Sequence, residues 1–139
     1  MEQHEIFREL IRGLERSLGV LDDTQSSCCS ITMTQCHALV EIGRAKTVSL
    51  VDLSGTLGLD KSTISRTIDH LVNAKLVSRS TDQSNRRYIT ISLTEDGKKV
   101  FTDIETTMNL QFKRVLKKIP KEKQSAVMDS LKILIKAFQ

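Results

Sequence analysis

The sequence predicts a mainly α-helical chain with one small β-hairpin and a long helix at each end. Apolar residues recur at three- and four-residue steps through most of the chain, as they do on the buried face of a helix. Between residues 76 and 93 the pattern changes to two short β-prone runs on either side of a wholly polar segment, which is typical of a hairpin. The single proline, Pro120, separates two helices predicted at the carboxyl end.

The first two helices are predicted on either side of a polar connection. One apolar stripe runs over residues 3–22, and Gly19 with the polar run 22–27 is expected to end that helix. Thr32 and Gln35 have the spacing of a capping box, so a second helix should begin at Thr32 and stop near residues 43–44. Its predicted buried face consists of Cys36, Leu39, Val40 and Gly43.

Two shorter helices should follow, joined by a turn at residues 55–60. Ser49 offers an N-cap for a helix that ends at Gly58, a residue suited to the left-handed conformation. Asp60 offers an N-cap for a helix from Lys61 to about Ala74. The order and spacing of the two helices are those of a helix-turn-helix.

The terminal helices carry more apolar surface than a small lobe could cover. A long helix is predicted from Thr94 to Ile119 and a final helix over residues 121–138. This surplus predicts a dimer. The apolar residues proposed for its interface are Phe7, Leu10, Ile11, Leu14, Leu131, Leu134, Ile135 and Phe138.

Charge and hydropathy argue against a membrane-spanning or exported protein and are compatible with one that binds nucleic acid. No apolar run approaches the roughly 18 residues that span a bilayer, and residues 1–5 show no export signal, so a cytoplasmic location is expected. The net charge is +4, and Lys and Arg gather in residues 61–66, 79–87 and 113–123. Such basic clusters suit nucleic acid, although they are also common on proteins that bind none.

The helix predicted over residues 61–73 has one apolar and one polar face. The apolar residues are Ile64, Ile68, Leu71 and Val72, and the polar ones are Ser62, Arg66, Asp69 and Asn73, flanked by Thr63, Ser65 and His70. Small side chains let a helix enter the major groove, and an arginine can bind guanine bidentately. An ordinary amphipathic helix is the alternative, but the polar tip at residues 82–87 could place arginines beside a phosphate backbone. The two elements together favour DNA binding.

These stretches resemble the MarR family. The matching motifs are Ile31-Thr32-x-x-Gln35-x-x-x-Leu39, Asp60-Lys61-Ser62-Thr63-Ile64-Ser65-Arg66-x-Ile68-Asp69-x-Leu71, Leu76-Val77-x-Arg79 and Arg86-Arg87-x6-Thr94-x-x-Gly97. The resemblance implies a winged helix-turn-helix in one domain, residues 1–139. Residues 31–97 would form the DNA-binding lobe, with 61–73 as recognition helix and 80–87 as wing. Residues 1–30 and 98–139 would be dimerisation helices.

The function implied by the resemblance is sequence-specific binding of double-stranded DNA by a transcriptional regulator. It would be an effector-responsive repressor that acts as a homodimer on a palindromic operator, is not an enzyme and needs no cofactor. The family usually has an acid two residues before the wing arginine, whereas this chain has Asn85 before Arg87. The residues proposed to contact DNA are Lys61, Ser62, Thr63, Ser65, Arg66, Asp69, Asn73, Arg79, Asn85, Arg86 and Arg87.

Three cysteines and a histidine lie around the start of the second helix: Cys28, Cys29, Cys36 and His37. One hypothesis is a sensor of thiol oxidants or a soft metal, because a helix N-terminus favours a thiolate and thiols bind soft ions. The alternative is that Cys36, on the predicted apolar face, is a small core residue. Cys36 and His37 also diverge by about 100° on a helix, which disfavours a shared ion. A small organic effector is a further possibility.

Other functions have less support. We find no Gly-rich phosphate loop, no Ser-His-Asp pattern and no metalloprotease motif, so an enzyme has no site in this sequence. A winged helix that serves as a protein-interaction module is the main alternative, because a fold alone does not fix a function. A small-molecule binder without DNA is a third.

Overall fold

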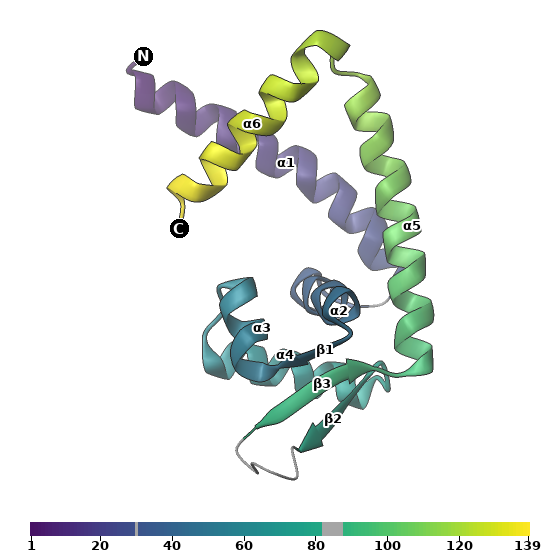
Figure 1. Cartoon of the computed structure of the whole chain (residues 1–139). Helices are drawn as coiled ribbons and strands as arrows, with labels where there is room; N and C mark the ends of the chain where they lie inside the picture. The colour runs from purple at the N-terminus through teal and green to yellow at the C-terminus, as the bar shows by residue number, and fades with distance from the viewer. Residues whose placement is uncertain (30, 82–87) are drawn as a thin grey trace. The chain divides into compact units, whose positions relative to one another are not determined.

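A computed structural model describes residues 1–29, 31–81 and 88–139, without the side chains of residues 20–29 (Figure 1). The chain divides into two compact units, residues 1–104 and 105–139. The helices are α1 (Gln3–Cys29), α2 (Met33–Ala45), α3 (Leu50–Leu57), α4 (Lys61–Asn73), α5 (Glu95–Lys117) and α6 (Lys121–Ala137). The strands are β1 (Thr47–Ser49), β2 (Val77–Thr81) and β3 (Ile89–Leu93).

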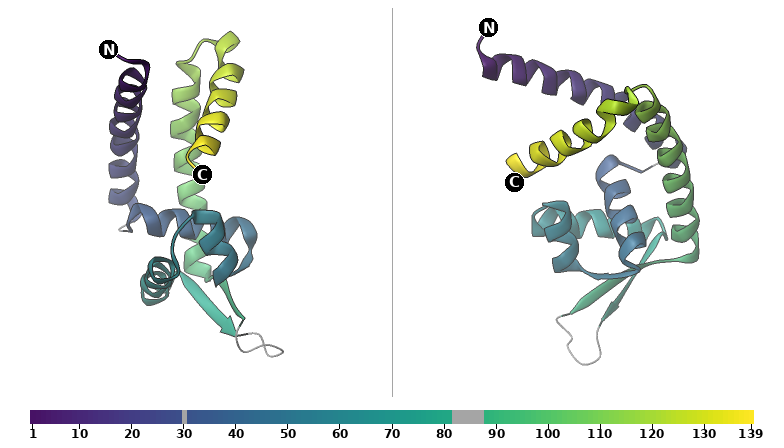
Figure 2. Two further views of the ribbon diagram at one scale, coloured as in Figure 1. Left: turned by 90° about the vertical axis from the view of Figure 1, so that its left-hand side faces the viewer. Right: turned by 45° about the horizontal axis from the view of Figure 1, so that its top comes forward.

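The predicted hairpin is one part of a three-stranded antiparallel sheet in the order β1-β3-β2. Val77 lies opposite Leu93 and Thr81 opposite Ile89, which confirms the hairpin. The third strand, β1, was not predicted: Val48 lies opposite Ile91. Three residues are too few to show the alternation of a strand, and the last of them also caps the next helix. Figure 2 shows the hairpin extending away from α2, α3 and α4.

The core of the first unit lies between α2, α3, α4 and the sheet. Cys36 and Leu39 of α2 are buried as predicted, but Val40 and Gly43 are only half-buried. Ala38 and Ile42 are buried as well, because α2 packs against α3, α4, β1 and β3 and so uses a wider face than one stripe. In α4 the predicted Ile64, Ile68 and Leu71 are buried, Val72 is half-buried, and Thr67 joins them with its hydroxyl donating to the Thr63 carbonyl at 2.9 Å.

The predicted helix starts are confirmed in detail. Thr32 Oγ1 accepts from the Gln35 amide, and the Gln35 side chain accepts from the Thr32 amide, each at 3.2 Å. Ser49 caps α3 and Asp60 caps α4. Gly58 closes α3 in the left-handed conformation, with φ at 64°.

The predicted end of the first helix is wrong. α1 continues to Cys29, past Gly19 and the polar run at residues 22–27. A glycine inside a helix costs about 1 kcal/mol relative to alanine, and Ser, Thr, Asp and Gln cost less. No proline stands in this segment, so the sequence offers only weak helix breakers there.

The start of α5 is fixed to the turn between α4 and β2. The Thr94 hydroxyl donates to the Lys75 carbonyl at 2.7 Å and accepts from the Gly97 amide at 3.0 Å. The Thr94 amide donates to the Leu76 carbonyl at 3.0 Å. A Cβ on Gly97 would lie 1.9 Å from the Leu76 oxygen, so this approach requires glycine. Thr94 and Gly97 therefore join the long helix to the lobe.

The second unit consists of the end of α5 and α6. Pro120 stands between them as predicted, and α5 ends at Lys117, just before the predicted Ile119. The Gln124 side chain donates to the carbonyls of Leu116 and Ile119 at 3.0 and 3.1 Å, and so closes the connection. Among the residues that the structure describes, none of the helices combines the length and the apolar character that a membrane span requires.

Candidate nucleic-acid interface

The polar face of α4 is exposed while its opposite face is anchored in the core. Lys61, Ser62, Arg66, Asp69 and Asn73 are exposed, as the sequence predicts. Of the remaining predicted contacts on α4, Thr63 and Ser65 are half-buried. Because the buried residues hold this helix against α2 and α3, the exposed side chains project from a fixed backbone.

The first turn of α4 is organised by Asp60. Its carboxylate accepts from the Thr63 amide at 2.8 Å, and the Ser62 hydroxyl lies 3.4 Å away. Hydrogen bonds from Thr63 hold the pKa of Asp60 below its ordinary value, with further lowering by Ser62 and by the charge of Arg66. The Arg66 guanidinium also reaches the Thr63 hydroxyl at 3.5 Å. Ser62, Thr63 and Arg66 are thus positioned together at the start of the helix.

Asp69 and Arg79 form an ion pair that the sequence did not predict. The Arg79 guanidinium donates to the Asp69 carboxylate, which ties β2 to α4. Both side chains are about half exposed, and such surface pairs contribute less than about 1 kcal/mol to stability. The pair therefore orients Arg79 beside α4 rather than stabilising the fold. The contact joins a helix to a strand, so no local pattern could have shown it.

The hairpin continues from this ion pair toward the predicted wing. Ser80 belongs to β2, where its carbonyl accepts from the Thr90 hydroxyl at 3.3 Å. The Ser78 and Ser92 hydroxyls lie 3.4 Å apart across the two strands. The proposed contacts Asn85, Arg86 and Arg87 lie outside the described residues, as does the rest of residues 82–87. The strands that carry this tip emerge next to α4 (Figure 1).

The helices and hairpin that form this surface coincide with a known sequence family. Residues 31–89, which run from the start of α2 to the start of β3, match the model of the MarR family. Over this segment the chain is similar to members of the MarR family. Members of this family are transcriptional regulators and not enzymes.

Two relatives from Bacillus subtilis (strain 168) extend the likeness beyond that segment. The uncharacterised HTH-type transcriptional regulator YfiV is 28% identical over 138 residues, which cover 99% of this chain and 86% of YfiV. The uncharacterised HTH-type transcriptional regulator YhjH is 28% identical over 101 residues, covering 72% of this chain and 58% of YhjH.

Solved structures share the fold over nearly the whole chain. Streptococcus pneumoniae FabT in complex with DNA has a TM-score of 0.86 at 16% identity, with 99% of this chain and 97% of FabT covered. The S. aureus MepR–DNA complex has a TM-score of 0.84 at 19% identity, covering 96% and 98%. The transcriptional regulator SlyA has a TM-score of 0.83 at 24% identity, covering 96% and 93%. The predicted winged helix-turn-helix fold is confirmed.

Of the proposed sensor residues, the structure describes the side chains of Cys36 and His37 only. Cys36 is only 4% exposed, and its amide donates to the Thr32 carbonyl at 2.9 Å. His37 is exposed, on another side of α2. The side chains of Cys28 and Cys29 lie outside the described residues. Among the side chains that are described, no three His, Cys, Asp or Glu residues gather closely enough to hold a metal ion. The burial of Cys36 favours a packing role.

Proposed function

We propose that this regulator binds double-stranded DNA in a sequence-specific manner, with α4 in the major groove and the β2–β3 hairpin beside the adjacent backbone. The observation that carries the proposal is the exposed polar face of α4, held rigid by Ile64, Thr67, Ile68 and Leu71. Two proteins of the same fold, FabT and MepR, are known in complex with DNA. A helix presented in this way is the usual reader of base edges.

The exposed residues of α4 differ in the contacts that they can make with DNA. Arg66 is exposed, sits one turn after the capped start, and can donate two parallel hydrogen bonds to guanine. Lys61 and Ser62 stand at the N-terminus of the helix, where backbone amides and a positive charge suit a phosphate. Asp69 accepts from Arg79, so we assign Asp69 to positioning Arg79 toward the backbone rather than to a base contact.

We propose further that the regulator acts as a homodimer on a palindromic operator. Apolar residues on α1, α5 and α6 are exposed in the single chain, and a second copy of the chain would cover them. Two copies would present two recognition helices to half-sites about one DNA turn apart. The exposed residues are Ile6, Phe7, Leu10, Leu14, Leu18, Leu110, Phe112, Val115, Met128, Leu131, Ile133, Ile135 and Phe138.

The regulatory outcome we propose is repression relieved by an effector. A dimer seated on an operator that overlaps a promoter would block access of the transcription machinery, so binding alone would be enough to repress. An effector that binds one arrangement of the two lobes better than another would shift the affinity for the operator. A promoter fusion in cells with and without the protein tests the direction, and higher expression in its absence is the expected result.

The experiment that tests DNA binding is enrichment of duplexes from a random pool, followed by affinity measurements on the enriched site. We expect a palindromic sequence. Arg66→Ala should relax the preference at one position in each half-site, at a cost of roughly 1–3 kcal/mol. Arg66→Lys keeps the positive charge but lacks the planar guanidinium that donates two parallel hydrogen bonds. Compared with Arg66→Ala, it should therefore regain affinity for DNA of any sequence without regaining the base preference.

The wing needs a separate measurement. Arg87→Ala should weaken binding to all duplexes. It should also reduce the slope of log affinity against log salt concentration by about the amount that one phosphate contact contributes. Lys99→Ala on α5 also removes a cation but leaves α4 and the hairpin untouched, so its salt dependence should match the native protein. If no duplex is enriched while a protein partner is captured, the chain is an interaction module and the proposal is wrong.

A further inference from the structure

The net positive charge of the chain lies in its second unit and not in the unit that carries α4. Residues 1–104 contain thirteen basic and fourteen acidic residues, so their net charge is −1. Residues 105–139 contain eight basic and three acidic residues, so their net charge is +5. The proposed reading of DNA by α4 therefore does not account for the positive charge of the chain.

Six of the cations of the second unit are gathered around the bend between α5 and α6 (Figure 1). All six side chains are exposed, and among the described residues none of them forms an ion pair. Glu122 is the only acidic residue within residues 113–123. We call these six residues the basic cluster: Lys113, Arg114, Lys117, Lys118, Lys121 and Lys123.

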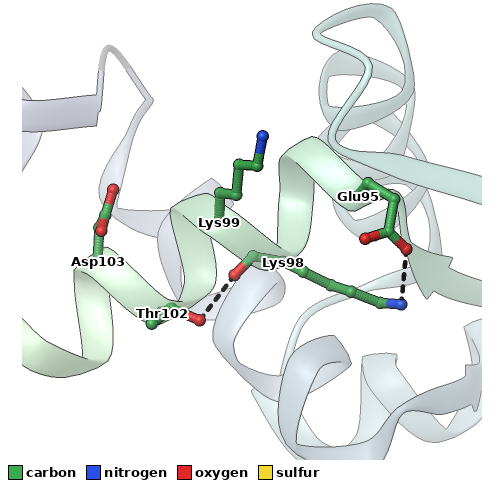
Figure 3. Close-up of a pocket in the computed structure, with 5 residues that line it drawn as sticks. All are labelled: Glu95, Lys98, Lys99, Thr102 and Asp103. Atoms are coloured by element: carbon green, nitrogen blue, oxygen red, sulfur yellow. Dashed lines mark hydrogen bonds and ion pairs between the residues drawn. The ribbon is translucent and has the colours of Figure 1, made fainter.

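The start of α5 shows how charges are arranged where they offset one another. Lys98 donates to the Glu95 carboxylate at 3.0 Å, and Lys99 and Asp103 project from the same turns of the helix (Figure 3). Acidic and basic side chains are interleaved there within a few residues. The basic cluster has six cations and one carboxylate, so its surface attracts anions from outside the chain.

Several charges of the basic cluster are placed where they oppose folding. Lys113 and Lys117 stand four residues apart in α5, and like charges at this spacing are destabilising. Lys121 and Lys123 lie in the first turn of α6, where the helix dipole disfavours cations. The dipole favours the cations in the last turn of α5, but a structural role does not explain the cluster as a whole. A binding partner for the cluster does explain it.

The basic and apolar side chains at the end of α5 lie on opposite sides of the helix. Successive helical residues are 100° apart, which places the four basic residues of α5 within an arc of about 140°. The apolar residues of the same turns lie on the other side: Phe112, Val115 and Leu116. Self-association through the apolar side, as proposed above, would therefore leave the basic cluster accessible.

The composition of the basic cluster fits the phosphate backbone of duplex DNA better than a membrane or a protein. Lys and Arg commonly bind DNA phosphates, and a duplex carries one negative charge for about every 1.7 Å of its axis. Stable binding to a lipid surface needs an apolar anchor beside the cations, and here the apolar residues lie on the opposite side of the helix. Lysine, which supplies five of the six cations, is depleted in protein interfaces.

We propose that the basic cluster is a second DNA-binding surface, which binds the phosphate backbone of duplex DNA without regard to sequence. Each cation that neutralises a phosphate releases a counterion, so this binding weakens steeply as the salt concentration rises. The inference concerns the cations of the second unit and does not depend on α4 reading an operator.

The test measures the affinity of the full chain for a short duplex of random sequence, by fluorescence anisotropy at about 50 to 200 mM salt. The cluster variant replaces the four cations of α5 with glutamine: Lys113→Gln, Arg114→Gln, Lys117→Gln and Lys118→Gln. Its affinity should fall at least about tenfold at the lowest salt, and its slope of log affinity against log salt concentration should fall by roughly 3 to 4. Its melting temperature should be unchanged or higher, because glutamine suits a helix and the repulsion is removed.

A matched control removes the same number of cations from exposed positions outside the basic cluster, α4 and the hairpin. This control variant carries Lys98→Gln, Lys99→Gln, Lys132→Gln and Lys136→Gln. It should keep most of the native affinity for the random duplex and most of the native salt slope. Equal losses in the cluster variant and in the control would show an effect of net charge alone and would overturn the proposal.

A third variant separates this surface from the proposed function of α4. Lys61→Gln with Arg66→Ala should lose the preference for an operator and still bind the random duplex. If no operator is enriched but the cluster variant alone loses affinity for the duplex, the second surface stands without the first. Unchanged binding of the random duplex by the cluster variant would overturn the proposal. So would binding of the native chain to vesicles of phosphatidylcholine and phosphatidylserine without binding to the duplex, since the partner would then be a membrane.

Discussion

Thr94 and Gly97 show how single residues couple the parts of the first unit. The Thr94 hydroxyl donates a hydrogen bond to the Lys75 carbonyl and accepts one from the Gly97 amide. One side chain therefore connects the turn after α4 to the start of α5. Gly97 then allows the helix to touch the Leu76 carbonyl. The motif Thr94-x-x-Gly97 is among the stretches that resemble the MarR family, and these contacts supply a physical reason for it.

Gly97→Ala should destabilise the protein by about 3 kcal/mol, because the added methyl group overlaps the Leu76 carbonyl and the backbone must move. Chemical unfolding followed by circular dichroism measures the change. Gly55→Ala in α3 is the matched control, since nothing lies within 4 Å of its added Cβ. That control should be neutral or stabilise by up to about 1 kcal/mol through helix propensity. Similar losses in both variants would contradict the contact.

The thiol of Cys36 should react slowly in the folded protein. It is buried in α2, a helix that packs against α4 and the sheet, so a reagent such as a disulfide probe can reach it only when the structure opens locally. In a Cys28→Ser/Cys29→Ser background, labelling should be at least about tenfold slower than in the urea-unfolded chain.

The thiol-sensor hypothesis makes the opposite prediction. Operator affinity would then respond to peroxide, zinc or arsenite in the native protein, and the response would disappear in one of Cys28→Ser, Cys29→Ser or Cys36→Ser. From the burial of Cys36 we expect no response through that residue, and a response lost in Cys36→Ser alone would show that its thiol is a sensor.

At the scale of elements, the boundaries set by local chemistry could be predicted and those set by distant contacts could not. The side chains of Thr32, Ser49 and Asp60 each accept a hydrogen bond from the backbone amide three residues later. The start of each helix is therefore determined by residues that are close in the sequence. β1 exists because it pairs with β3, which is far along the chain, and no short window reveals that. The polar segment at the end of α1 contains no proline, and the helix extends through this segment.

The same division holds for the candidate site. Helical periodicity alone identified which face of α4 is exposed, including Arg66 and Asn73. It could not show that Asp69 is engaged by Arg79, since that partner is brought in by the turn after α4.

The cap of α4 should depend on pH. Hydrogen bonds from Thr63 lower the pKa of Asp60, so the ionised cap stabilises the folded state at pH values above the ordinary range of an aspartate. This contribution is lost as pH falls through the lowered pKa of the folded protein. Asp60→Ala should therefore have a lower melting temperature at pH 7, and the gap to the native protein should narrow below about pH 4.

Asp60→Asn is the control for this prediction, because an asparagine caps a helix without titrating near pH 4. Its difference in melting temperature from Asp60→Ala should be constant over the same pH range. A native-minus-Ala difference that is unchanged from pH 7 to pH 3 would show that ionisation of Asp60 does not contribute to the cap.

On the scale of the whole molecule, the two units differ in how they are stabilised. The first contains all of the buried apolar residues among those described, from Cys36 to Ile104. Residues 105–139 contribute no fully buried side chain among those described, and Phe112, Ile133 and Phe138 are each at least 45% exposed. A helical pair with so little core of its own needs a partner surface, since burial of apolar area is what stabilises it.

The chain should therefore sediment at micromolar concentration with twice its mass of 15.7 kDa. Leu131→Glu with Ile135→Glu places two charges on the exposed apolar side of α6, and the double variant should sediment as a monomer. Operator affinity should then fall by about a hundredfold or more, because the two lobes no longer bind as one ligand. Lys132→Glu changes the charge of the same helix without touching its apolar residues, and it should stay dimeric. A native chain that sediments as a monomer would show that the chain does not self-associate. A double variant that remains a folded dimer would show that the interface lies elsewhere than on this side of α6.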